Sequence, residues 1–182
     1  MNEKSKEILK KEGWYEGRKI DITELLKYYD NENLNEIYRK NFELEVFPKA
    51  KEFLEEFGDI IISKKHPYHI FDLGRAFKTK YSPKYAEEIS ILLNQKTLVI
   101  GMCSGGMNII YIVESGEIYD SYGYLAKDIY EMWDSILETI PESEMPHRTW
   151  EQLGLLDELS RIESEVYRKY KKQHADNQVL KL

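Results

Sequence analysis

The chain has 182 residues, of which 42% are hydrophobic, so it is long enough for one well-buried core and short for two independent domains. Its net charge of −7 argues against a nucleic-acid binder, because contacts with phosphates need a basic surface. No stretch reaches the roughly 18 uninterrupted apolar residues of a membrane span, and the N-terminal sequence lacks the apolar region of a secretory signal, so we expect a cytoplasmic protein that does not contact membranes.

The first elements that the sequence predicts are two short helices. Residues 3–12 form a highly charged helix that Gly13 can end in the left-handed conformation. Asp21 and Glu24 then imitate a capping box, which predicts a helix over residues 22–29.

The clearest helix signal lies in residues 47–58, with Pro48 in the first turn and Gly58 at the end. One face of this helix is apolar: Phe47, Ala50, Phe53, Leu54 and Phe57. Residues 59–63 and 68–72 follow as short strands, because they are rich in β-branched and aromatic residues.

A further helix starts at Ser82-Pro83, with Ala86, Ile89, Leu92 and Leu93 facing inward. From Lys96 onward the apolar period changes to two. The segments TLVIGM, MNIIYIV and EIYD are separated by the glycine-bearing turns CSGG and ESGE. This pattern predicts a meander of three antiparallel strands.

The only cysteine lies in Gly101-Met102-Cys103-Ser104-Gly105, which matches the nucleophile elbow of hydrolases. Such an elbow is a strand followed by a helix, whereas residues 108–113 read as a strand. None of the four histidines, His66, His69, His147 and His174, has a spacing that implies contact with Cys103. We therefore expect no enzyme activity, and we keep a cysteine hydrolase using Cys103 as a remote alternative.

Metal and phosphate motifs are also weak. His66 and His69 flank a proline, and no cysteine or carboxylate cluster completes the four ligands that zinc prefers. The glycines near Cys103 do not form a nucleotide-binding motif. We expect no metal and no cofactor.

Helical spacing returns in residues 125–140, which predicts a helix facing the core. The sequence PESEMP then reads as a linker. A last long helix follows from Trp150 to Tyr170, ahead of a polar tail. This helix either packs on the same protomer or serves as an arm for oligomerisation or partner binding.

The negative charge is concentrated in two segments: residues 30–59 carry −5 and residues 114–144 carry −8. Both segments are either solvated faces without a partner or surfaces that attract a basic one. Tyrosines lie among the carboxylates of the second segment, and tyrosine is well suited to protein interfaces. We therefore predict a partner-binding surface made of Glu114, Glu117, Asp120, Tyr122, Tyr124 and Asp128, with the hairpin tip from Cys103 to Gly106 nearby.

Several stretches, in this order, resemble the SUKH superfamily, especially its third immunity subgroup. They are GWYEGR (Gly13, Trp14, Gly17, Arg18), KAKEFLEEFGDIII (Ala50, Phe53, Leu54, Phe57, Gly58), the HIFD strand, the hairpin over residues 99–119 and the helix that ends near residue 141. The resemblance covers about residues 8–141. We therefore divide the chain into a SUKH-like domain, residues 1–141, and a linker with a helical extension, residues 142–182.

The resemblance implies an α+β fold with a central, mostly antiparallel sheet flanked by helices, to which this chain adds a C-terminal helix. It also implies an immunity protein without catalysis, which neutralises a cognate bacterial toxin, frequently a nuclease, by stoichiometric binding. A basic toxin domain would suit the acidic segments. The alternative is an adaptor of the same fold that docks cellular proteins.

Overall fold

The computed structural model describes residues 1–27, 29, 45–62, 71–76, 82–103 and 108–179. The order of elements along the chain is α1 (Glu3–Lys11), α2 (Thr23–Leu26), α4 (Pro48–Phe57), α5 (Leu73–Ala76), α6 (Ser82–Leu93), β1 (Thr97–Cys103), β2 (Asn108–Val113), β3 (Ile118–Asp120), β4 (Gly123–Ala126), α7 (Ile129–Ile136), the 3₁₀ turn η2 (Glu142–Glu144), β5 (Arg148–Thr149) and α8 (Leu156–Val179). This composition confirms the expected α+β class.

The sheet is an antiparallel meander in which the spatial order of the strands, β1-β2-β3-β4-β5, repeats their order in the sequence. Side chains alternate between its two faces because successive residues of a strand point in opposite directions. Leu98, Ile110 and Ile112 therefore join one apolar cluster, while Val99 and Tyr111 join another. The sheet thus has a helix-covered core on each face.

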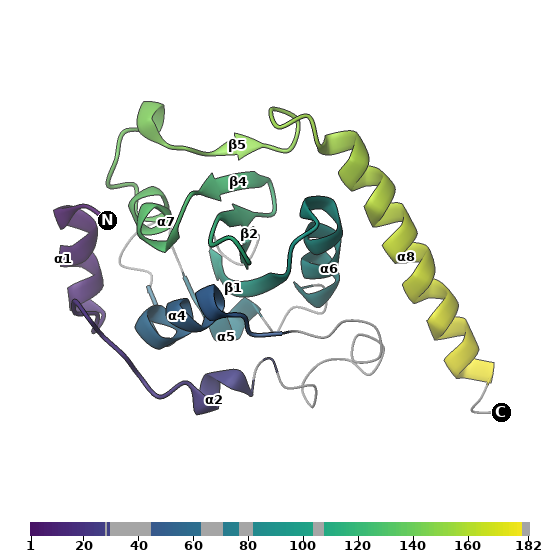
Figure 1. Ribbon diagram of the computed structural model, residues 1–182, viewed down its shortest axis with the longest axis horizontal. Helices are drawn as coiled ribbons and strands as arrows, with labels where there is room; N and C mark the ends of the chain where they lie inside the picture. The colour runs from purple at the N-terminus through teal and green to yellow at the C-terminus, as the bar shows by residue number, and fades with distance from the viewer. Residues whose placement is uncertain (28, 30–44, 63–70, 77–81, 104–107, 180–182) are drawn as a thin grey trace.

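The first core lies between the sheet and α4, α5 and α7, on the side of the molecule where α1 also docks (Figure 1). Its centre is aromatic. The ring of Trp133 in α7 lies 4.8 Å from that of Phe71 and 5.4 Å from that of Phe57, centroid to centroid. Trp133, Phe57 and Phe71 are fully buried, so these contacts fix α4 and α7 relative to the sheet.

The second core lies under α6, and α8 packs against α6 on the side of the molecule opposite α1 (Figure 1). The buried side of α8 consists of Leu159, Ile162, Val166 and Tyr170 at helical spacing. Lys169 pairs with Glu87 of α6 at 2.6 Å, and Tyr170 donates a hydrogen bond to the same carboxylate. The last helix therefore packs on its own chain, one of the two arrangements that its sequence allowed.

Several predicted boundaries were wrong. The helix predicted over residues 125–140 begins only at Ile129, because Leu125 lies in β4. The meander has five strands where three were predicted, and the last helix begins at Leu156, six residues after Trp150. Strands β4 and β5 have four and two residues, too few to give a readable period.

Two strands were predicted after α4. In the described residues they correspond to one isolated antiparallel bridge, between Ile62 and Phe71. Residues 63–70 between them, with His66 and His69, lie outside the described residues. The helix predicted over residues 22–29 is described as α2, which has four residues. Asp21 does act at its start, since its carboxylate accepts a hydrogen bond from the backbone N–H of Thr23 at 2.9 Å.

Candidate partner-binding surface

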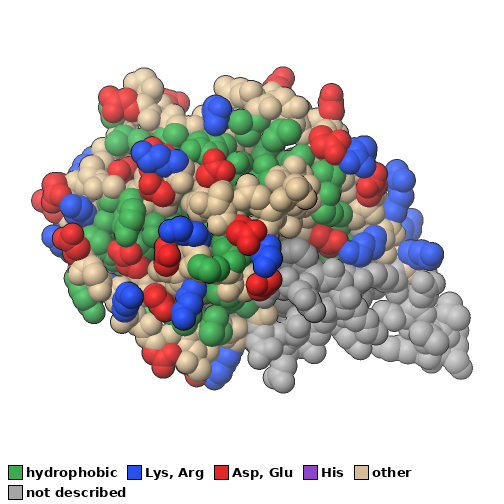
Figure 2. All heavy atoms as spheres, viewed as in Figure 1, with side chains coloured by type: hydrophobic (Ala, Val, Ile, Leu, Met, Phe, Trp, Pro, Cys, Tyr) green, Lys and Arg blue, Asp and Glu red, His purple; other side chains and the backbone are tan. Residues whose placement is uncertain are grey.

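A groove with a volume of about 520 Å³ lies where α4 faces the turn between β2 and β3 and the start of α7. Its charged lining residues are Arg18, Lys19, Lys49, Glu52, Glu55, Glu56, Lys127 and Asp128. Its other side chains include Ile112, Ile129 and Tyr130. Figure 2 shows acidic, basic and hydrophobic side chains interspersed on one face of the molecule.

Helix α4 supplies one wall of the groove because its sequence divides it into two faces. Ala50, Phe53, Leu54 and Phe57 are buried against the sheet. The polar positions between them therefore point away from the core, which brings Lys49, Glu52 and Glu56 to the groove. Pro48 in the first turn fixes where this helix begins.

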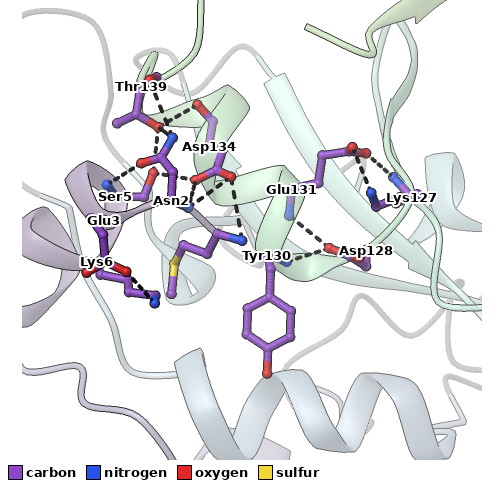
Figure 3. A network of polar contacts seen from close by, with 11 residues as sticks. Asn2, Glu3, Ser5, Lys6, Lys127, Asp128, Tyr130, Glu131, Asp134 and Thr139 are labelled. Atoms are coloured by element: carbon purple, nitrogen blue, oxygen red, sulfur yellow. Dashed lines mark hydrogen bonds and ion pairs between the residues drawn. The ribbon is translucent and has the colours of Figure 1, made fainter. Parts of the chain in front are cut away.

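The start of α7 supplies the opposite wall. The carboxylate of Asp128 caps this helix, accepting hydrogen bonds from the backbone N–H groups of Tyr130 at 3.0 Å and Glu131 at 2.8 Å. Figure 3 shows Tyr130 projecting from α7 away from this cap, toward a second helix. That helix is α4, since the Tyr130 hydroxyl donates a hydrogen bond to Glu56 at 3.0 Å.

Polar contacts at the other end of α7 hold α1 in place (Figure 3). The carboxylate of Asp134 accepts hydrogen bonds from the backbone N–H of Asn2 at 2.9 Å and from the hydroxyl of Ser5 at 2.6 Å. The side-chain amide of Asn2 also donates to the Thr139 hydroxyl at 2.9 Å. Helix α7 is thus fixed at both ends, which keeps the groove wall in one position.

Glu56 lies at the centre of the groove's contacts. Its second carboxylate oxygen accepts from the indole N–H of Trp14 at 3.0 Å, so both oxygens have a donor. Arg18 bonds to the backbone carbonyl of Glu56 at 2.7 Å and pairs with Asp59 at 2.5 Å. The GWYEGR stretch therefore serves to hold α4 and to orient this carboxylate.

The pKa of Tyr130 responds to the environment of the groove. Partial burial, the hydrogen bond to Glu56 and the negative charges of Glu56, Asp128 and Glu52 raise the pKa of Tyr130 to about 12. The hydroxyl therefore stays protonated and continues to donate to Glu56. Burial is the largest cause of the pKa shift, and the hydrogen bond to Glu56 and the neighbouring carboxylates add to it.

Three of the predicted recognition residues lie near the groove. Asp128 lines it. Glu114 and Glu117 flank Ser115 and Gly116, which also line it. Glu114 is exposed and lies 4.0 Å from Lys96, and Glu117 accepts a hydrogen bond from the Ser115 hydroxyl at 3.1 Å.

The other three predicted recognition residues, Asp120, Tyr122 and Tyr124, lie elsewhere on the sheet. Asp120 is only 3% exposed. Its carboxylate accepts from Asn108 at 2.9 Å and from the backbone N–H groups of Tyr122 at 2.8 Å and Gly123 at 3.0 Å. Asp120 therefore holds the turn between β3 and β4, which an antiparallel meander places at the end of the sheet opposite the β2–β3 turn.

Tyr122, on that turn, is 53% exposed. Tyr124 is half-buried on the face that α6 covers, where its ring lies 5.6 Å from that of Tyr119 and carries the guanidinium of Arg148 at 4.9 Å. Glu114, Glu117 and Asp128 thus lie in or beside the groove, while Tyr122 lies at the other end of the sheet. Tyr124 lies nearer to the acids, since burial and then the charges of Glu131, Glu117 and Asp128 raise its pKa.

The predicted hairpin tip falls partly outside the described residues, which omit 104–107. Cys103 is buried at the end of β1, opposite Asn108 in β2. The chain after the tip is strand β2, as the sequence predicted, so no helix stands behind Cys103. Within the described part of the chain, no group of three or more His, Cys, Asp or Glu residues could hold a metal ion.

Sequence reasoning missed Glu56, Trp14 and Tyr130 as site residues. One signal was available: Glu55 and Glu56 follow Glu52 by three and four residues, so both lie on the same side of a helix as Glu52. The contact between Trp14 and Glu56 spans 42 positions, and no local pattern encodes it.

None of the helices in the described ranges is long and apolar enough to cross a membrane. In the comparison with protein families, the family model described as SUKH-3 immunity protein matches residues 1–139. No curated protein and no solved structure matches the chain.

Proposed function

The chain belongs to the SUKH-3 immunity protein family, a non-catalytic family whose role is toxin neutralisation, and from this premise we propose that its cognate toxin is a basic protein domain, a nuclease, captured by stoichiometric binding. The proposal places this capture in the cytoplasm of the cell that carries both genes. There the immunity protein occludes the toxin and transforms no substrate.

One observation carries the proposal: the two acidic segments of the sequence meet at one groove. Glu52, Glu55 and Glu56 come from the segment 30–59, and Asp128 comes from the segment 114–144. The two segments together carry a formal charge of −13, while the whole chain carries −7. A nuclease must be basic where it contacts phosphates, so the carboxylates that these segments bring to the groove suit its active face, although four basic residues also line the groove.

The proposed recognition surface combines this groove with the residues that the sequence indicated. Glu114, Glu117 and Asp128 attract the toxin over a distance and set its register. Tyr122 supplies exposed aromatic area, of the type that contributes roughly 2 kcal/mol or more at interface centres. Asp120 contributes indirectly by holding the turn that carries Tyr122, and Tyr124 lies at the edge of this surface.

The domain organisation is part of the proposal. Residues 1–141 form the immunity domain, and residues 142–182 form a linker and an extension. Helix α8 of the extension packs on α6, which supports its assignment as a brace for the sheet. An arm that joins copies of the chain is the other role considered for this helix.

Co-expression tests the proposal. The gene directly upstream should encode a protein with a toxic C-terminal domain, and that domain should stop growth of a host cell when expressed alone. We expect expression of this chain to restore growth and the two proteins to purify as a complex of fixed stoichiometry. Failure to restore growth, or rescue without a complex, would contradict the proposal.

A further inference from the structure

The groove contains two carboxylates that are held in place but not neutralised. Glu56 is fixed by Trp14 and Tyr130, and Asp128 by two backbone N–H groups at the start of α7. Within the part of the chain that the structure describes, neither carboxylate forms an ion pair. A carboxylate offers about four lone-pair sites, so each keeps acceptor capacity for a further donor.

The basic residues of the groove are mostly engaged elsewhere. Arg18 pairs with Asp59 at 2.5 Å, and Lys127 lies 3.4 Å from Glu131; neither of these acids lines the groove. Lys49 pairs with Glu52 at 2.8 Å. The formal charges of the lining residues balance, and Glu55 lies 3.6 Å from Lys51, which does not line the groove. Among the lining residues this leaves the negative charges of Glu56 and Asp128 against the single positive charge of Lys19.

An exposed aromatic ring lies between the two carboxylates. Tyr130 is 41% exposed, and it is linked to Glu56 through its hydroxyl and to Asp128 through its backbone N–H. The face of an aromatic ring attracts cations within about 6 Å of its centre. Aromatic side chains are also enriched among the residues that dominate interface energies.

We propose that this groove receives an arginine side chain of the toxin, with its guanidinium bound by Glu56 and Asp128 and stacked on the ring of Tyr130. This inference rests on the proposed function, because the toxin is the partner. Arginine fits better than lysine because its planar, forked guanidinium can stack on a ring and donate to two acceptors at once. An ammonium group is a compact, strongly hydrated charge that gains less from the ring.

The arrangement also explains how a strong contact can form at small entropic cost. Both carboxylates are ordered before the partner arrives, so binding need not immobilise them. Neutralising one of them should therefore weaken arginine binding by about tenfold, the scale of a charge-assisted hydrogen bond.

The indole N–H of Trp14 provides a reporter for the groove, because it donates to Glu56, which lines it. The chain has three tryptophans, so an amide correlation spectrum of the full-length protein labelled with ¹⁵N should show three indole signals. Trp14 donates to Glu56, whereas Trp133 is buried in the core and Trp150 donates to Ser121 at 3.3 Å. The signals of Trp133 and Trp150 serve as internal controls.

The probe is N-acetyl-arginine amide, compared with the corresponding lysine and citrulline amides at low ionic strength. We expect the Trp14 signal to shift and saturate with the arginine compound, with a dissociation constant in the millimolar range. The lysine compound should bind several-fold more weakly. Citrulline, which has the shape of arginine without its charge, should leave the signal unchanged.

The variants Glu56→Gln and Asp128→Asn test the two carboxylates. Glutamine still accepts from Trp14, and the Tyr130 hydroxyl can turn to accept from its amide; asparagine still caps α7. Each should weaken arginine binding about tenfold. Glu163→Gln on the exposed side of α8 is the matched control and should change nothing. Unmoved Trp133 and Trp150 signals would show that each variant is folded.

No saturable Trp14 shift with arginine, equal shifts with lysine or citrulline, or undiminished binding by both variants would overturn the inference. The co-expression experiment tests the proposed function separately from the groove assignment. If co-expression rescues growth but arginine does not bind, only the groove assignment is wrong. If arginine binds but no toxin is neutralised, the groove is a guanidinium site and the proposed function is wrong.

Discussion

Gly101 lies in β1 with its Cα directed at the ring of Phe71. A Cβ at this position would come within 2.3 and 2.4 Å of two atoms of that fully buried ring. No carbon atoms pack this closely, so the ring or the strand would have to shift. The absence of a side chain thus allows the aromatic core to approach the sheet.

We predict that Gly101→Ala destabilises the fold by about 1 to 3 kcal/mol, measured as the free energy of unfolding in urea. The double variant Gly101→Ala, Phe71→Leu isolates the cause, because the smaller side chain leaves room for the new methyl group. The alanine should cost clearly less in that background. An equal cost in both backgrounds would show that Phe71 is not responsible.

His147 is a residue whose charge should affect stability near neutral pH. Its Nε2 lies 3.6 Å from Asp120, and the side-chain interaction with this carboxylate raises the pKa of His147 more than burial lowers it. Since the pKa is raised in the folded state, the contribution to stability is complete below the unfolded pKa of about 6.5. It is lost as pH rises through the folded pKa.

We therefore predict that the free energy of unfolding falls between about pH 6 and pH 8 by up to about 1 kcal/mol from this pair, a limit set by solvent screening. His147→Gln should remove this part of the pH dependence. The comparison is made by urea unfolding at several pH values. A variant with the same slope as the wild type would rule out His147 as the titrating group.

At the scale of elements, a narrow apolar stripe of α8 holds this helix on α6. Ile162 in this stripe is 1% exposed, while its neighbours Arg161 and Glu163 are exposed. We predict that Ile162→Ala lowers the free energy of unfolding by about 2 to 4 kcal/mol, through lost burial and the cavity that remains. Ser164→Ala, on the exposed side of the same helix, should cost less than about 0.5 kcal/mol.

The free energies of unfolding of these two variants also test the role of the extension, residues 142–182. If α8 braces the domain, the two variants will differ as predicted at every protein concentration. Equal stabilities, or a cost that depends on protein concentration, would instead indicate that α8 is loosely attached or joins different copies of the chain.

The elements that could be predicted are those with a complete local pattern. Helix α4 was predicted almost to the residue, because a proline start, an apolar face and a glycine end agree. Strand β4 was misassigned because Leu125 and Ile129 happen to be four residues apart, which extends the helical spacing of α7 backward into the strand.

The candidate site residues also divide into those that the sequence indicates and those that only the fold brings together. Asp128, Glu114 and Glu117 could be proposed from the sequence because charge is visible in it, and their role in binding stays a prediction. The burial of Asp120 was not foreseen, since it depends on Asn108 and on the turn between β3 and β4. Glu56 and Tyr130 meet across 74 positions, so only the packing of α4 against α7 brings them together.

At the scale of the whole molecule, acidic and basic side chains are interspersed, and four of each line the groove. Carboxylates from both acidic segments reach the groove side, while the second half of α8 exposes Arg168, Lys171 and Lys172 on the other side. Under the proposed function, Glu114, Glu117 and Asp128 would orient a basic partner toward the groove side before contact. Orientation of this kind increases the association rate more than it slows dissociation.

The central claim is that a basic toxin is captured through this acidic surface. The measurement that tests it most directly is the association rate with the upstream toxin domain as a function of ionic strength. We predict that the variant Glu114→Gln, Glu117→Gln, Asp128→Asn associates about tenfold more slowly at low salt, with a shallower dependence on salt. The variant Asp157→Asn, Glu163→Gln, Glu165→Gln removes the same charge from α8 and should associate at nearly the wild-type rate. Equal rates and equal salt dependence for the wild type and both variants would contradict capture through this acidic surface.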